Sequence, residues 1–156
     1  MDSGDNGGMA GNDVKIIAYH DHDRAQVKGI AGNCLEDLPI VTAAGFIEST
    51  EGPVIGIFHQ YAYYGKHKTI HSVPQIEHFD IKIDCTSRKK GGKQRVLTPD
   101  GWIIPLNVRN GLTYMVMRPP TDSEITEYPK VAFTSDDTCD PTVLDDETDL
   151  TVPMII

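Results

Sequence analysis

The residues whose types could carry out chemistry stand at the start of the sequence, in the triplet Asp2-Ser3-Gly4. The Ser hydroxyl can hydrogen-bond a neighbouring loop, and the Gly allows a turn where a side chain would clash. Two carboxylates held close together share one proton, so one can act as a base toward water and the other as an acid toward a carbonyl. The triplet therefore predicts hydrolytic chemistry if a second carboxylate is supplied. By itself, such a triplet is more often an ordinary turn or helix N-cap than a catalytic site.

The composition indicates one globular unit with an acidic surface. The chain has 156 residues and a net charge of −9, and its mean hydropathy is −0.29. No apolar run reaches the ~20 residues of a membrane span, and the acidic charge makes nucleic acid an unlikely partner. The three cysteines, Cys34, Cys85 and Cys139, are odd in number and widely spaced, which fits reduced thiols. We expect a cytoplasmic location and no contact with a membrane.

Short apolar runs separated by turn residues predict an all-β fold. Strands are expected at 14–19, 25–30, 38–48, 53–64, 95–98, 102–108 and 112–118. The polar run His20-Asp21-His22-Asp23 predicts a turn, and Asp100-Gly101 and Asn110-Gly111 predict tight hairpin turns. Residues 69–79 are the one plausible helix, shortened or broken by Pro74.

Motifs in a fixed order run along nearly the whole chain. They are D-S-G-x-N-G-G-M-A-G (2–11), V-K-G-I (27–30), D-L-P-I-V-T-A (37–43), G-P-V-I-G-I-F-H-Q-Y-A-Y-Y-G-K (52–66), K-T-I-H-S (68–72), Q-I-E-H-F (75–79), G-G-K-Q-R (91–95), D-G-W-I-I-P-L (100–106), N-G-L-T-Y-M-V-M-R-P (110–119) and T-S-D-D-T-C-D-P-T-V-L-D-D (134–146). In these motifs the chain resembles the retropepsin-like aspartic protease region of copia-type retrotransposon Pol polyproteins, continuing into the segment before the integrase.

The resemblance implies a retropepsin-like closed barrel of mostly antiparallel strands with one short helix, plus a further β-hairpin segment. Asp2, Ser3 and Gly4 would form the catalytic turn. A flap over the substrate would be formed by Val27, Lys28, Gly29, Ile30 and Gly32. Two bulky residues and a glycine, Tyr63, Tyr64 and Gly65, would support the catalytic loop.

The resemblance also implies a partner, a substrate and a division of the chain. The sequence has one Asp-Ser-Gly, so an active enzyme must be a homodimer with Asp2 from each subunit. The substrate would be polyprotein peptide, and no cofactor is needed because water is the nucleophile. The expected units are a protease domain (1–83), a β-rich pre-integrase-like segment (84–120) and an acidic linker or tail (121–156).

Two departures from the family pattern bear on activity. Asp5 stands where the family usually has Ala, and only Met1 precedes Asp2 where the family has a hydrophobic strand. The protease domain is therefore expected to lack its first strand, and its being an enzyme stays open. The alternative function is a catalytically inactive, retroelement-derived β-domain with a structural or interaction role.

Other patterns carry weaker hypotheses. The basic run 88–95 could help an adjoining integrase handle nucleic acid, but it is more typical of a solvated loop. His59, His67, His71 and His78 lie close together in the sequence, yet their spacing lacks the H-E-x-x-H pattern of a zinc helix, and no metal site is predicted. The acidic residues between Asp136 and Asp149 do not follow the spacing of a calcium loop.

Overall fold

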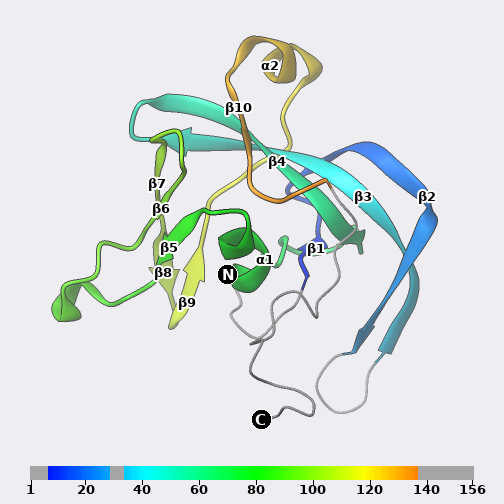
Figure 1. Cartoon of the computed structure of the whole chain (residues 1–156), viewed down its shortest axis with the longest axis horizontal. Coiled ribbons are helices and arrows are strands. Elements are labelled where there is room, and N and C mark those ends of the chain that lie inside the picture. Colours follow the sequence, from blue (N-terminus) through cyan, green and yellow to red (C-terminus); the bar gives the residue numbers. More distant parts are fainter. Residues whose placement is uncertain (1–6, 29–33, 137–156) are drawn as a thin grey trace, which may run out of the picture.

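The computed structural model describes residues 7–28 and 34–136, and for residues 21–28 and 34–36 it describes the backbone alone. Its main sheet runs in the order β1-β4-β3-β2, with β10 also paired to β4 (Figure 1). The strands are β1 (Met9–Ala10), β2 (Lys15–Lys28), β3 (Cys34–Ser49), β4 (Gly52–Tyr63) and β10 (Lys130–Ala132). Since β3 takes one edge of β4, the short parallel strands β1 and β10 share the other edge.

The hairpin of β3 and β4 is the centre of the sheet. The Ser49 hydroxyl donates to the carbonyl of Gly52 and accepts from the backbone N–H of Glu51, which closes the turn. Gly52 has a φ of 115°, a conformation that favours glycine. The strand predicted at 53–64 is thus confirmed, because β-branched and aromatic side chains line β4 and suit a pleated, buried surface.

The turn expected at residues 20–23 is wrong, because these residues lie within β2, which forms a second hairpin with β3. β2 continues through this polar run, with an irregularity between the pairs His20–Ile40 and Arg24–Pro39. A bulge of this kind places extra residues on one strand while the pairing resumes beyond it. The polar residues therefore interrupt the register without ending the strand.

Helix α1 (Val73–His78) lies inside the segment expected to be helical. Pro74 falls in the first turn, where its missing N–H removes no helix hydrogen bond. The Ser72 side chain caps the helix by accepting from the backbone N–H of Gln75. Proline thus sets where this helix begins and does not break it.

The remaining elements form two small sheets and a second helix. They are a three-stranded sheet of β5 (Lys82–Asp84), β6 (Arg95–Leu97) and β7 (Ile103–Pro105), a hairpin of β8 (Asn107–Arg109) and β9 (Leu112–Tyr114), and helix α2 (Asp122–Glu127). The turns predicted at Asp100-Gly101 and Asn110-Gly111 are present, with positive φ at Gly101, Asn110 and Gly111.

The all-β class is confirmed, but the expectation of a single helix is wrong. The sheets of the described residues do not close into a barrel. Besides α1 there is α2, which begins at a capping box of Thr121 and Glu124 within the stretch expected to be a linker or tail. None of the helices among the described residues is long and apolar enough to cross a membrane.

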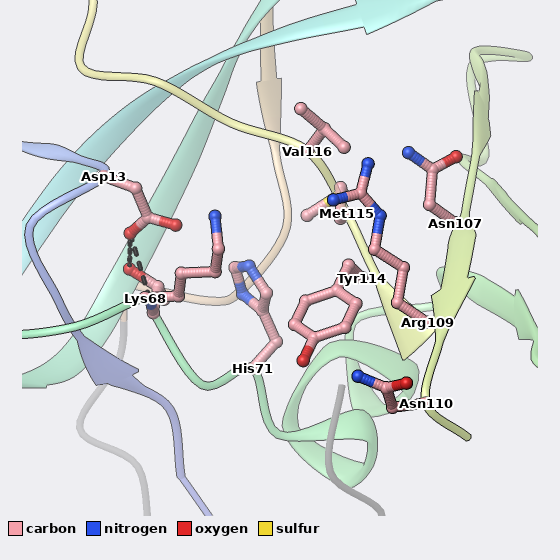
Figure 2. A pocket seen from close by; sticks show the side chains of 10 residues that line it. Asp13, Lys68, His71, Asn107, Arg109, Asn110, Tyr114, Met115 and Val116 are labelled. Atoms are coloured by element: carbon pink, nitrogen blue, oxygen red, sulfur yellow. Dashed lines mark hydrogen bonds between the residues drawn. The ribbon is translucent and has the colours of Figure 1, made fainter. Parts of the chain in front are cut away.

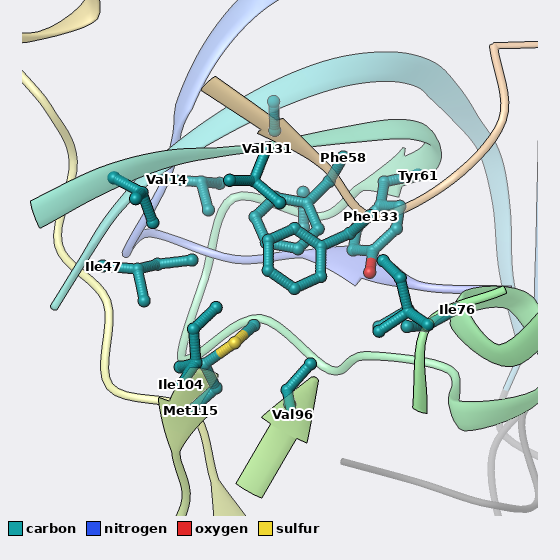
Figure 3. Packing of buried hydrophobic residues seen from close by; sticks show 14 of the residues in the cluster. Val14, Ile47, Phe58, Tyr61, Ile76, Val96, Ile104, Met115, Val131 and Phe133 are labelled. Carbon is teal, nitrogen blue, oxygen red and sulfur yellow. The ribbon is translucent and has the colours of Figure 1, made fainter. Parts of the chain in front are cut away.

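The hydrophobic core joins the main sheet to the rest of the chain (Figure 3). Phe58 of β4 stacks on Phe133 with ring centroids 4.9 Å apart, and both side chains are fully buried. Ile76 of α1, Val96 of β6 and Ile104 of β7 belong to the same cluster. β10 and Phe133, which lie in the stretch expected to be a linker or tail, are therefore part of the main sheet and its core.

We expect Phe133→Ala to lower the free energy of unfolding by about 3–5 kcal/mol, since it removes a fully buried ring from this cluster. Phe79→Ala is the matched control, because Phe79 is 37% exposed, and its loss should be clearly smaller. Urea denaturation of both variants measures the difference. Equal losses would show that the chain after α2 is not part of the core.

Candidate functional site

The predicted site residues fall in three places. Asp2, Ser3, Gly4, Gly29, Ile30 and Gly32 lie outside the described residues. Val27 and Lys28 end β2, where their backbones pair with Leu35 and Cys34 of β3. Tyr63 ends β4, and Tyr64 and Gly65 follow it directly. The expected roles of these residues stay predictions, and the described geometry around them begins at β1.

β1 follows the triplet Asp2-Ser3-Gly4 closely in the sequence and is held from two sides. On one side, the backbone N–H groups of Ala62, Tyr64 and Gly65 donate to carbonyls of Gly8 and Ala10 at 3.0–3.1 Å. On the other side, Met9 and Ile70 exchange a pair of backbone hydrogen bonds at 2.8 and 2.9 Å. The chain is therefore fixed within a few residues of Gly4.

The hydrogen bonds on the two sides of β1 are called the β1 clamp below. Two of the expected support residues, Tyr64 and Gly65, take part in it. The carbonyl of Ala10 accepts from both Tyr64 and Gly65, at 3.0 and 3.1 Å. Gly65 has a φ of 77°, and a Cβ there would come within 3.0 Å of the Tyr63 ring. Tyr63 in turn packs edge-on against Tyr19 of β2, with centroids 6.3 Å apart.

Two glycines of the N-terminal run are required by close packing. A Cβ on Gly8 would lie 2.4 Å from the ring of Tyr61, and a Cβ on Gly11 would lie 2.2 Å from the carbonyl oxygen of His67. Real Cβ atoms do not approach so closely. The glycine-rich composition that looked like a turn signal thus also serves to bring β1 against β4 and the segment 67–70.

Gln75 of α1 joins the clamp from inside the molecule. Its side chain is buried, its Oε1 accepts from the backbone N–H of Gly8 at 2.8 Å, and its Nε2 donates to the carbonyl of Gln60 at 3.2 Å. Because these backbone groups are buried, the amide side chain provides hydrogen bonds that water does not.

A buried polar pair lies beside Gly8. The Tyr61 hydroxyl and His71 Nδ1 are 2.8 Å apart, and His71 is 3% exposed. Burial lowers the pKa of His71 from 6.5 to about 3 and raises the pKa of Tyr61. His71 is therefore neutral at physiological pH, and its Nε2 has no hydrogen-bond partner among the described residues.

His71 also lines a pocket of about 300 Å³. Lys68 and His71 form one side of it, and Arg109, Tyr114 and Met115 of the β8–β9 region form the other (Figure 2). Asp13 lies at its edge, where its Oδ1 accepts from the backbone N–H and the hydroxyl of Thr69. The pocket thus gathers two cations, a neutral imidazole and an apolar wall.

A second polar cluster joins β2, β3 and β4. The hydroxyl of Thr42 lies 3.1 Å from His20 Nε2 and 3.0 Å from His59 Nδ1. Burial lowers the pKa of His59, although the negative charge of Asp136 opposes this shift. In the part of the chain that the structure describes, no three His, Cys, Asp or Glu residues converge as metal ligands.

The pocket residues were not found by reading the sequence. Lys68 lies in the loop before α1, and Arg109 ends β8, far away along the chain. No pattern of residue spacing links two such positions. The signal that could have pointed to His71 is its place between Ile70 and the helix-capping Ser72. A buried histidine and a surface one look alike at such a position.

Comparisons with known proteins add no assignment. No family model matches the sequence, and neither a curated protein nor a solved structure matches the chain. The resemblance to retropepsins therefore depends on the motifs of the sequence.

We expect Gly8→Ala to lower the free energy of unfolding by about 1–3 kcal/mol, because the new methyl group would overlap the Tyr61 ring. Gly7→Ala is the matched control, since nothing lies within 4 Å of a Cβ there. Chemical denaturation measures both. If the two variants were equally stable, β1 would not pack on β4 as described.

The buried imidazole predicts a pH dependence of stability. The unfolded chain binds a proton at His71 near pH 6.5, whereas the folded protein does so only near pH 3. This part of the stability is therefore complete above about pH 6.5 and is lost as the pH falls toward 3, by up to about 1.4 kcal/mol per pH unit. Urea unfolding over this range should show a shallower decline in His71→Gln than in the wild type.

The exposed His78 provides the control, since His78→Gln should leave the decline unchanged. An independent readout is the NMR titration of the His71 ring in the wild-type protein. A midpoint near 6.5 for His71 would contradict its burial.

Proposed function

We propose that this chain is one subunit of a retropepsin-type aspartic endopeptidase, in which each of two subunits contributes Asp2. The observation that carries the proposal is the clamp on β1, which fixes the chain shortly after Asp2-Ser3-Gly4. A shared-proton pair requires carboxylates held in a set position, and a strand bonded on both sides next to the triplet supplies such a support. A retropepsin-type fold, whose sheets do not close into a barrel among the described residues, and a cytoplasmic location belong to the same proposal.

The reaction would use water as the nucleophile. One Asp2 carboxylate accepts a proton from water, which attacks the scissile carbonyl, and the partner's carboxylic acid donates a proton toward that carbonyl. Since each chain has one Asp-Ser-Gly, the pair forms only in the homodimer. The substrates would be extended peptides at polyprotein junctions.

The long β2–β3 hairpin supports the expected flap. It extends beyond the body of the main sheet (Figure 1), and β2 and β3 remain paired as far as Lys28 and Cys34. The expected tip residues Gly29, Ile30 and Gly32 follow Lys28 directly. A hairpin of this length could cover a bound peptide and exclude water from the carboxylates.

Asp5, which follows Gly4 directly, would change the pKa of the carboxylate pair. A further negative charge near the carboxylate pair raises the pKa of the pair, because it disfavours ionisation. It also adds repulsion where two subunits meet. In this proposal the enzyme is active at acidic pH, where one proton remains on the pair.

Asp2→Asn and Asp5→Asn form a matched test, since each removes one carboxylate from the same turn. We expect Asp2→Asn to abolish cleavage of a peptide mixture, followed by mass spectrometry, because an amide cannot shuttle the proton. Asp5→Asn should retain cleavage and move the alkaline limit of the pH profile to lower pH. Analytical ultracentrifugation should show dimers of the wild type and both variants.

Cleavage that persists in Asp2→Asn would falsify the proposal. A wild-type chain that stays monomeric and cleaves nothing over the acidic pH range would favour the alternative, a catalytically inactive β-domain that keeps the fold for an interaction.

A further inference from the structure

Two positive charges at the pocket beside His71 have no ion-pair partner among the described residues. The protein has a net charge of −9, and the ion pairs of its described residues are Lys15–Asp122 and Arg118–Glu124. Neither Lys68 nor Arg109 has such a partner in that part of the chain. Two cations that face one pocket without a carboxylate partner repel each other, so an anion between them would be attracted.

The carboxylate that lines the pocket, that of Asp13, does not fill this role. Asp13 uses Oδ1 to accept two hydrogen bonds from Thr69, and this contact holds the segment 67–70 against β1. Because Lys68 and Arg109 each carry a positive charge and Asp13 one negative charge, the pocket keeps a net positive charge.

His71 provides a second, independent observation. Its side chain is almost fully buried at the wall of the pocket, and its Nε2 has no partner in the described structure. When the Tyr61 hydroxyl donates to Nδ1, the neutral ring carries its proton on Nε2 and can donate. A buried donor without an acceptor is costly, and an anion whose oxygen reached Nε2 from the pocket would remove that cost.

We propose that this pocket binds a small organic anion, with a carboxylate or phosphate group toward Lys68, Arg109 and His71 Nε2 and an apolar part against Tyr114 and Met115. A volume of about 300 Å³ is at the lower end of small-molecule sites. None of the residues proposed to hold the anion belongs to the triplet Asp2-Ser3-Gly4, so the site can exist whether or not the chain is a protease.

The site would nevertheless be linked to β1. Thr69 follows Lys68 directly, and its hydroxyl accepts from the backbone N–H of Gly11 at 3.0 Å. An anion that orders Lys68 therefore also stabilises the segment that clamps β1. Anion binding at Lys68 would therefore also stabilise the position of β1.

The test uses the full chain carrying Asp2→Asn, so that binding at the proposed carboxylate pair cannot contribute. The probes are phenyl phosphate, benzoate, inorganic phosphate and the neutral benzyl alcohol, titrated by calorimetry and by NMR of the histidine rings. Arg109→Gln removes one cation of the pocket from an exposed position, and Arg88→Gln removes an exposed cation elsewhere. Circular dichroism checks that both variants fold.

We expect phenyl phosphate or benzoate to bind with a millimolar Kd and to shift the His71 Nε2 resonance. Arg109→Gln should weaken binding about tenfold, as for the loss of a charge-assisted hydrogen bond, whereas Arg88→Gln should not. The tighter of the two probes identifies the preferred head group, and inorganic phosphate should bind more weakly than phenyl phosphate.

Four results would overturn the proposal. They are equal binding to Arg109→Gln and Arg88→Gln, equal binding of benzyl alcohol and the anions, a His71 resonance that does not respond, and no saturable binding of either aromatic anion.

Discussion

The placement of β1 is the constraint on which the rest of the structure depends. This strand of two residues is bonded in parallel to the end of β4 and in antiparallel fashion to Ile70. Such a short strand buries little apolar surface, so its position must come from hydrogen bonds on both sides and from close packing. Gly8 and Gly11 allow that packing, because any side chain would overlap Tyr61 or the backbone at His67. The segment 67–72 and helix α1 follow from the same arrangement, since they form its far side.

Polar side chains inside the protein stabilise this arrangement. Gln75 connects α1 to Gly8 and Gln60, Thr69 connects Asp13 to Gly11, and Tyr61 pairs with His71. Buried backbone groups that lack a strand partner need acceptors and donors from elsewhere, and side chains on neighbouring elements provide them. The cost of leaving any one of these groups unpaired makes the network specific for a single arrangement of β1.

Strand β1 and the proposed anion pocket both contact one short segment, residues 67–72. Residues 67–72 bond to β1 through Met9 and Ile70, and they line the pocket through Lys68 and His71. β1 leads back to Asp2-Ser3-Gly4, whereas the pocket is completed by the β8–β9 region. The described residues before position 84 and residues 84–120 are thus packed against each other, through the pocket and through Val96, Ile104 and Met115 in the common core. Any function of the N-terminal turn would be supported by residues from both parts.

Local patterns in the sequence determined the strands of the β3–β4 hairpin, the turns at Gly101 and Gly111 and the place of α1, because β-branched runs, glycine at positive φ and a proline in the first helical turn act over a few residues. The capping box of Thr121 and Glu124 was also readable, although α2 was not predicted. The passage of β2 through residues 20–23 and the pairing of β10 with β4 depended on partner strands, which no local pattern identifies. Tertiary structure alone decided three features: the open sheet, the burial of His71 and the placement of Lys68 and Arg109 around one pocket. These features depend on contacts between residues that are distant in sequence, such as packing against Phe133 and the burial of the His71 ring. Such contacts cannot be read from a local pattern.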